Sequence, residues 1–186
     1  MNDAAASTLL VSFPGTILPA LASALGTRMD AAEAAQLLRE MGSALGEPLH
    51  RLLEVQVDER FPGTRPEQLA EDEFWAAFSE LFQQMGWGDL TRERLHPGVA
   101  ALSSSHWFEA APDAGGSFPA CHLSTGALAE LLRRVAGEQT AVLEVECRSR
   151  GDGRCRFLVG GEQTLSPLFG AMQDGTPYRQ AIESLG

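Results

Sequence analysis

The sequence lacks an excess of basic residues and any long hydrophobic run. Its 186 residues include 14 basic and 25 acidic side chains, for a net charge of −11. Nucleic-acid phosphates and anionic membranes both attract basic surfaces, so neither is expected as a partner. The most apolar N-terminal stretch, residues 9–25, contains Pro14, Gly15 and Pro19 and has no basic flank. It resembles neither a signal peptide nor a membrane span, and we expect a cytoplasmic protein.

The motifs of common nucleotide-dependent and hydrolytic enzymes are also missing. The sequence has no P-loop, no Gly-x-Gly-x-x-Gly after a predicted strand, and no Ser-His-Asp spacing typical of a nucleophile elbow. Its histidines are scattered, at His50, His96, His106 and His122. We therefore predict no catalytic residues and expect a binding protein in preference to an enzyme.

Cysteine is scarce, and all of it falls in one stretch, from Cys121 to Cys155. Cys147 and Cys155 each lie four residues from Gly151, so a hairpin centred on that glycine would place them opposite each other, with Cβ atoms ~5 Å apart. Cys121, at the start of a predicted helix, could supply a third thiolate to a tetrahedral metal site. Two alternatives remain open: three ordinary buried thiols, or a Cys147–Cys155 disulfide beside one buried thiol.

The fourth ligand of such a site is not determined by the residue pattern. Nearby candidates are Glu144, Glu146, His122 and Asp152. Strand alternation places Cys147 on one face of its strand and both glutamates on the other. A glutamate could therefore join the cysteines only through a β-bulge or a twisted edge.

Hydrophobic spacing predicts an α+β fold, with a four-stranded antiparallel sheet and helices packed on one face. The expected elements are a long helix from Asp30 to about Val57, a helix over 66–85, strands over 90–95 and 99–105, a helix over 119–135, the cysteine hairpin, and helices over 164–172 and 177–185. Small residues along the long helix, among them Gly42 and Gly46, would permit close approach by a second helix. Residues 30–186 are predicted to form one domain. Residues 1–29 are an expected N-terminal arm, either packed on the domain or in a dimer contact, with a strand over 9–13 and a helix over 17–25.

An aromatic stripe marks the second predicted helix, and further aromatic residues follow the first hairpin. Such a stripe belongs either to the core or to the wall of a ligand pocket between the helices and the sheet. His106 could anchor a ligand there, or could be an ordinary histidine at a strand end. The candidate pocket residues are Phe74, Trp75, Phe78, Phe82, His106, Trp107 and Phe108.

The cysteine region resembles the 4-vinyl reductase (4VR) domain, a module of a bacteriochlorophyll-synthesis protein and of the sensor domains of aromatic-responsive bacterial activators. The resemblance depends on a Cys-x-x-x-x-Gly helix start, a Glu-x-x-Cys strand and a Gly-Asp-x-x-Cys-x-Phe hairpin. These motifs lie at 121–126, 144–147 and 151–157. In the phenol-sensing members the same pattern is a zinc site. The resemblance therefore implies zinc as cofactor, with ligands Cys121, Glu144, Cys147 and Cys155.

The resemblance also implies a fold similar to subunits of the TRAPP vesicle-tethering complex and to haem NO-binding domains. Those relatives commonly form dimers, so a homodimer is expected. The function it favours is a zinc-braced, sensor-type module for a small hydrophobic or aromatic molecule. Two alternatives are an accessory protein or enzyme in tetrapyrrole vinyl reduction, and a scaffold or assembly subunit. With four protein ligands the zinc would be structural, because no coordination position is open to substrate.

Overall fold

The computed structural model describes residues 14–185. A four-stranded antiparallel sheet of order β1-β2-β4-β3 lies at its centre. The strands are β1 (Thr91–His96), β2 (Val99–Ser104), β3 (Thr140–Glu146) and β4 (Cys155–Gly161). The predicted α+β class and its four-stranded sheet are confirmed. The expected strand over 9–13 lies outside the described residues.

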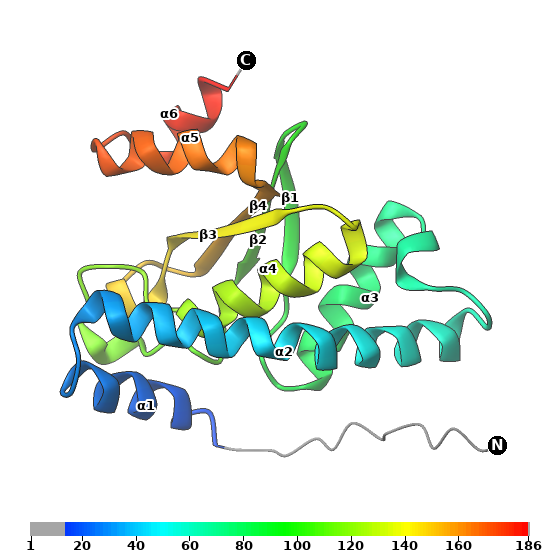
Figure 1. Cartoon of the computed structure of the whole chain (residues 1–186), viewed down its shortest axis with the longest axis horizontal. Coiled ribbons are helices and arrows are strands. Elements are labelled where there is room, and N and C mark those ends of the chain that lie inside the picture. The colour runs from blue at the N-terminus through cyan, green and yellow to red at the C-terminus, as the bar shows by residue number, and fades with distance from the viewer. Residues whose placement is uncertain (1–13, 186) are drawn as a thin grey trace.

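Three helices cover one face of the sheet: α2 (Ala31–Arg60), α3 (Glu71–Gln84) and α4 (His122–Ala136). This is the helical layer that the sequence predicts, and Figure 1 shows α2 and α4 side by side in front of the sheet. Asp30 caps α2, since its carboxylate accepts a hydrogen bond from the Glu33 N–H at 2.8 Å. Gly137, at φ +70°, ends α4.

Two C-terminal helices, α5 (Glu162–Gln173) and α6 (Tyr178–Glu183), add a smaller layer on the opposite face. Alternation along β4 explains this second layer, because Phe157 and Val159 point into the main core while Leu158 points into the smaller one. Glu146 on β3 holds α6 in place, with Tyr178 and Arg179 as partners. The sheet is therefore covered on both sides.

Helices α2 and α4 approach each other closely, because glycines line their contact. A Cβ atom at Gly42 would lie 2.0 Å from the carbonyl oxygen of Leu123, and one at Gly126 would lie 2.1 Å from that of Arg39. Real Cβ atoms cannot come so near to backbone atoms, so only glycine fits at these two positions. The contact fixes the N-terminal end of α4, which carries Cys121.

The remaining described elements are α1 (Ile17–Gly26) and three short 3-10 turns at Pro66–Gln68, Pro112–Ala114 and Arg148–Arg150. Helix α1 matches the predicted helix over 17–25. It lies below α2 in Figure 1, and none of its residues is fully buried. Among residues 14–185, no helix combines the length and the hydropathy that crossing a membrane would need.

Candidate metal centre

Four buried side chains from separate parts of the chain meet at one point: Cys121, Glu144, Cys147 and Cys155. One ligand atom from each lies within 4.8 Å of all the others. The Cys121 Sγ is 3.9 Å from the Cys147 Sγ and 3.8 Å from the Cys155 Sγ. Thiolates at two corners of a tetrahedron with a Zn–S distance of about 2.3 Å would be about 3.8 Å apart. The sulfur spacing is therefore that of a tetrahedral metal site, and all three cysteines are free of disulfides.

The β3–β4 register brings two of the thiols together, as the hairpin prediction required. Glu146 pairs with Arg156, and continuing that register by one residue places Cys147 opposite Cys155. The connection is longer than a tight hairpin turn and contains the 3-10 turn Arg148–Arg150, followed by Gly151 at φ +95°. Cys121 arrives from the start of α4.

A β-bulge brings Glu144 to the same side of the strand as Cys147. Glu144 pairs with Phe157 and Glu146 with Arg156, so Val145 is an extra residue in β3. Without the bulge, residues 144 and 147 would point to opposite faces. With it, Glu144 and Cys147 both face the helical layer, while Val145 packs in the core under α5 and α6. The spacing Glu-x-x-Cys is therefore the spacing that a single bulge requires.

The two oxygens of Glu144 have different environments. Oε2 accepts a hydrogen bond from the Cys121 backbone N–H at 2.8 Å, which orients the carboxylate. Oε1 is buried and has no hydrogen-bond partner among the described residues. A buried carboxylate oxygen without a partner is costly, and a cation would satisfy it. The donor set therefore fits a metal ion of zinc type.

The three other candidate fourth ligands lie outside this cluster. Glu146 points to the opposite face and accepts hydrogen bonds from Arg154 and Tyr178. His122 follows Cys121 on α4 but is not part of the group. Asp152 supports the site from outside, since its carboxylate accepts the Cys147 backbone N–H at 2.7 Å. This bond gives the Gly-Asp motif of the hairpin a physical role.

Without a cation the four groups disfavour one another's charged forms. Burial raises the pKa of Glu144 to about 9, with the Cys147 thiolate as a second cause. Hydrogen bonds from the Cys121 and Cys155 thiols lower the pKa of Cys147, and bonding to Cys147 is the largest cause of the raised pKa of Cys121. The hydrogen bond with Cys121 lowers the pKa of Cys155, but bonding to Cys147 and burial outweigh it and raise that pKa to about 12. A divalent ion would stabilise all four anions together.

Glu109 is a buried residue near the site that the sequence analysis missed. Its carboxylate accepts hydrogen bonds from the Leu123 and Ser124 backbone N–H groups at 2.9 and 2.8 Å, and from the Ser124 hydroxyl. The Trp107 indole N–H donates to the same hydroxyl at 2.7 Å. Burial raises the pKa of Glu109 to about 7, against the effect of its hydrogen bonds. Glu109 thus caps α4 from a distant part of the chain, and no local sequence signal marks such a cap.

Replacing Glu109 with alanine should destabilise the protein by about 2–3 kcal/mol, because two buried N–H groups and a hydroxyl lose their acceptor. Asp30→Ala, which removes the exposed cap of α2, is the matched control and should cost about 1 kcal/mol. Urea unfolding of both variants would measure the difference. Equal losses would show that Glu109 does not hold the start of α4.

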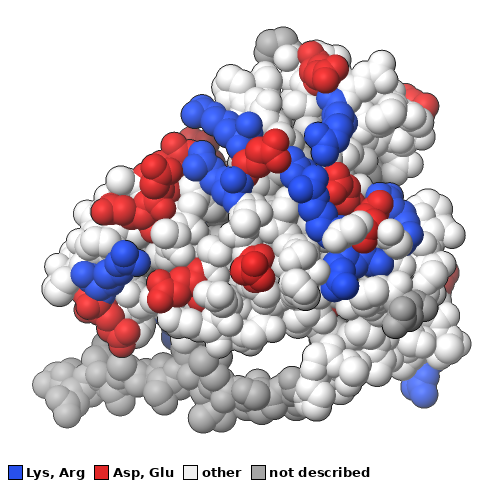
Figure 2. Space-filling model, turned by 180° about the vertical axis from the view of Figure 1, so that it is seen from behind, with Lys and Arg blue, Asp and Glu red and all other residues white. Residues whose placement is uncertain are grey.

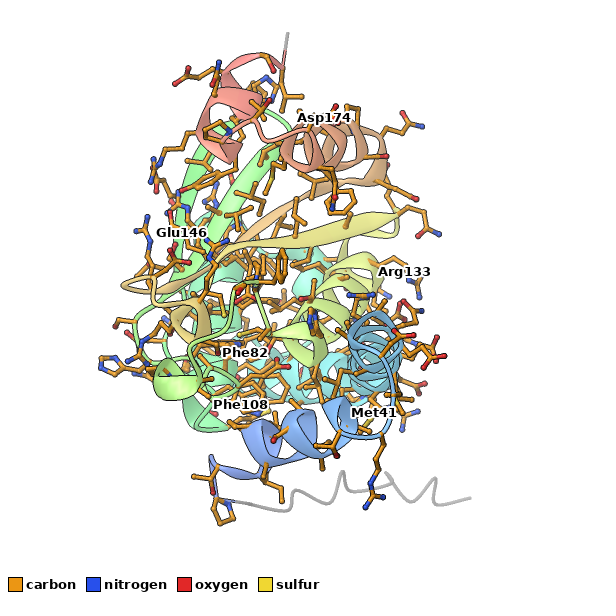
Figure 3. The ribbon with its side chains drawn as sticks, turned by 90° about the vertical axis from the view of Figure 1, so that its left-hand side faces the viewer. Met41, Phe82, Phe108, Arg133, Glu146 and Asp174 are labelled. Carbon is orange, nitrogen blue, oxygen red and sulfur yellow. The ribbon has the colours of Figure 1, made fainter. Side chains whose placement is uncertain are left out.

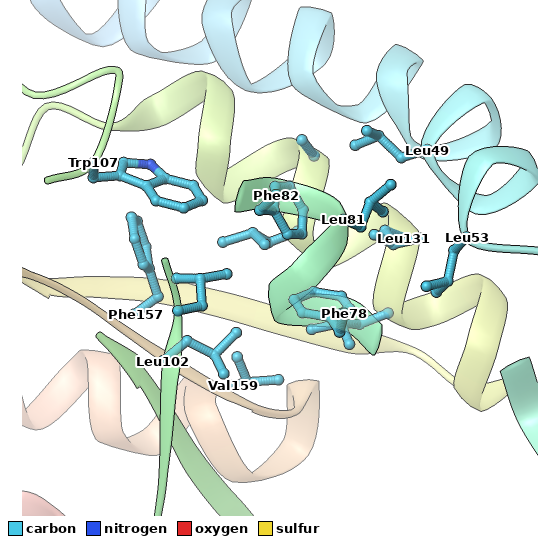
Figure 4. Close-up of a cluster of buried hydrophobic side chains, with 14 of the residues drawn as sticks. Leu49, Leu53, Phe78, Leu81, Phe82, Leu102, Trp107, Leu131, Phe157 and Val159 are labelled. Carbon is cyan, nitrogen blue, oxygen red and sulfur yellow. The ribbon is translucent and has the colours of Figure 1, made fainter. Parts of the chain in front are cut away.

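The predicted pocket residues lie mostly within the main core. Phe74, Phe78, Phe82 and Trp107 are buried, and neighbouring rings in this set have centroids 5.0–5.7 Å apart. Figure 4 shows Phe78, Phe82 and Trp107 packed with Leu102 and Phe157 between the helices and the sheet. Trp75 and Phe108 are half-buried, and His106 is exposed. Trp87, absent from the prediction, stacks on Phe108 with centroids 4.1 Å apart.

Two concave surfaces flank this core in the described part of the chain. A groove of about 630 Å³ lies between α2 and α3, lined by residues that include Val55, Gln56 and Met85. A smaller cleft of about 230 Å³ lies between the start of α3 and the β1–β2 end of the sheet. Trp75 lines this cleft, and it is the only one of the seven predicted pocket residues that lines either concavity.

An α+β fold of this order, with a buried cluster of three cysteines and a glutamate, defines a sensory-domain architecture with a possible metal site. Residues 104–161 match the family model of the vinyl-4-reductase domain, a stretch that contains all four clustered residues and confirms the predicted 4-vinyl reductase resemblance. No curated protein matches the chain.

Solved structures show the same fold. The phenol-responsive sensory domain of the transcription activator PoxR aligns at a TM-score of 0.61 and 18% identity, over 82% of this chain and 76% of that chain. A trafficking protein particle complex subunit 3 from Naegleria fowleri, covalently bound to palmitic acid, aligns at 0.60 and 11% identity, over 78% and 91%. A vinyl-4-reductase family protein from Methanocaldococcus jannaschii aligns at 0.48 and 20% identity, over 76% and 74%.

Proposed function

We propose that this protein is a zinc-braced, sensor-type module that binds a small aromatic or hydrophobic molecule and performs no chemistry on it. The tetrahedral spacing of three thiols and one free carboxylate oxygen is the observation that carries the proposal. Cys121, Glu144, Cys147 and Cys155 would fill the four positions of the ion, which leaves none for a substrate. The ion would then join the start of α4 to the β3–β4 connection. Reduced thiols suit the cytoplasm, where we place the protein.

The ligand site that we propose is the cleft beside Trp75. It lies between a helix and the sheet, as the sequence analysis expected, and its volume of about 230 Å³ suits one aromatic ring. The more deeply buried aromatic residues then form the rigid floor of the module. The fold of the PoxR domain, which is described as phenol-responsive, supports a small-molecule role by analogy of shape alone.

A binding titration tests this assignment. Calorimetry of the metal-loaded chain with single-ring aromatic compounds should give saturable binding, and Trp75→Leu should weaken it at least about tenfold by removing the ring surface. Val55→Ser, in the α2–α3 groove, is the matched control and should leave the affinity unchanged. The reverse pattern would move the site to that groove, and no binding at all would favour a scaffold role.

A homodimer contact through α1 is the second part of the proposal. Helix α1 is apolar, yet none of its residues is fully buried, and Ile17, Leu37 and Met41 on α1 and α2 are 49%, 37% and 41% exposed. Figure 3 shows Met41 on α2 where that helix passes above α1. Exposed apolar side chains on two adjacent helices suit a partner surface. We assign residues 1–29 to this contact and residues 30–186 to the domain.

The dimer is tested by mass. Light scattering should give twice the chain mass for the native protein, and Ile17→Glu combined with Met41→Glu should give the monomer mass because each charge would be buried in the interface. Phe169→Glu, at a 47% exposed position on α5, should remain dimeric. A native protein that elutes as a monomer at all concentrations would refute the contact.

A further inference from the structure

The cleft beside Trp75 is basic, although the protein carries a net charge of −11. Its lining includes two arginines, Arg92 and Arg94, against a single acid, Glu71. Figure 2 shows arginines gathered over the upper part of one face of the molecule, with acidic side chains among them. Most arginines elsewhere are neutralised by neighbouring acids, so an excess of positive charge inside a cleft is informative about its ligand.

One wall of the cleft suits an aromatic ring. The Arg92 guanidinium lies over the Trp75 ring, 5.4 Å from its centroid. Ala100 and Val159 supply apolar surface from β2 and β4. A ring placed here would pack against indole and aliphatic carbon, which is the environment that a flat hydrophobic molecule prefers.

Three donors in the same cleft lack an anionic partner. The Arg92 Nε is buried and has no hydrogen-bond partner among the described residues, although the same side chain pairs with Glu71 through Nη2. Arg94 is exposed and forms no ion pair with any described residue. His96 Nδ1 accepts the Gly98 N–H at 3.2 Å, which leaves the ring proton on Nε2. A buried guanidinium N–H without an acceptor is costly.

From this arrangement we infer that the cleft binds an aromatic carboxylate, with its ring against Trp75 and its carboxylate on Arg92 Nε and Arg94. The inference rests on the proposed small-molecule function and names the chemical class of its ligand. A neutral phenol or alcohol fills the ring position but leaves the two arginines without an anion. A carboxylate accepts from both, and its charge is complementary to the cleft.

Three ligands separate the contributions of ring and charge. Benzoate carries both, benzyl alcohol carries the ring without the charge, and acetate carries the charge without the ring. Calorimetric titration of the full, metal-loaded chain should show benzoate binding about tenfold or more tightly than benzyl alcohol, with no measurable heat from acetate. Higher salt should weaken the binding of benzoate and leave that of benzyl alcohol unchanged.

Arg94→Gln tests the anion position, because the side chain is exposed and its loss should not disturb the fold. The variant should bind benzoate at least about tenfold more weakly and benzyl alcohol as before. Arg65→Gln, an exposed arginine outside the cleft, is the control and should change neither affinity. Benzyl alcohol binding as tightly as benzoate, or benzoate binding that is unchanged in Arg94→Gln, would overturn the carboxylate inference while the proposed function stands. Failure of every aromatic compound to bind would overturn both.

Discussion

Cys121→Ser should leave a purified protein without its metal and largely unfolded at 37 °C. The residue is fully buried, and its Sγ is the shared neighbour of the other two thiols. A structural zinc contributes on the order of 10 kcal/mol to folding in small modules, which is comparable to the whole stability of an ordinary domain of about 5–15 kcal/mol. Metal analysis together with circular-dichroism melting would measure both consequences.

Glu144→Gln is the milder companion, and Glu146→Gln is its control on the same strand. The amide introduced at position 144 could still accept the Cys121 N–H but would be a weaker metal ligand, so we expect metal affinity to fall about 10–100-fold. Glu146 faces the other side of the sheet and binds Arg154 and Tyr178, so its substitution should leave metal content unchanged. Full metal content in both Cys121→Ser and Glu144→Gln would contradict the assignment of this cluster.

Acid should release the metal from the native protein. In the metal-free protein the pKa of Glu144 is raised to about 9 and that of Cys155 to about 12, so both hold protons at neutral pH. These protons must leave when the ion binds, so binding weakens as the pH falls. Chelator competition at several pH values should show this sign.

Gly126→Ala should be among the most destabilising single methyl groups that can be added to this protein. Its Cβ would lie 2.1 Å from the Arg39 carbonyl oxygen and 3.0 Å from the Ser43 nitrogen, so α2 and α4 would have to separate. Overpacking against backbone atoms that cannot rotate away costs about 3 kcal/mol. Because α4 carries Cys121 at its start, the same change should also weaken metal binding. Urea unfolding and chelator competition would measure the two effects.

Gly170→Ala is the matched control, since Gly170 is inside α5 and nothing lies within 4 Å of an added Cβ. It should stabilise the protein by about 0.5–1 kcal/mol, because alanine favours a helix more than glycine does. The two substitutions make the same chemical change and should have opposite signs. Equal or similar stabilities would show that the α2–α4 contact is not as close as described.

The sequence was sufficient to predict the regular parts of this fold. The alternation of β2 and β4, the cap at Asp30 and the stop at Gly137 are local signals, and each element lies close to its expected position. The glycines of α2 correctly indicated a close helix contact. The second layer formed by α5 and α6 was not predicted, because short helical segments do not reveal which face of a sheet they cover.

The candidate site was predictable in part. Cysteine spacing alone indicated a three-thiol cluster, whereas strand alternation excluded Glu144 unless a bulge was present. The bulge at Val145 is a property of the β3–β4 pairing, and only the family resemblance pointed to it. Glu109 was missed because its contacts with α4 span a loop of more than a dozen residues. Aromatic periodicity likewise could not distinguish the packed Phe78 and Phe82 from the cleft residue Trp75.

X-ray absorption spectroscopy at the metal edge of the purified, reduced protein tests the central claim most directly. One ion per chain with three sulfur neighbours at about 2.3 Å and one oxygen at about 2.0–2.2 Å is the predicted result, with zinc as the element. A fully folded protein that contains no metal would contradict the claim. So would an ion surrounded only by nitrogen and oxygen, because the three thiols would then have another role.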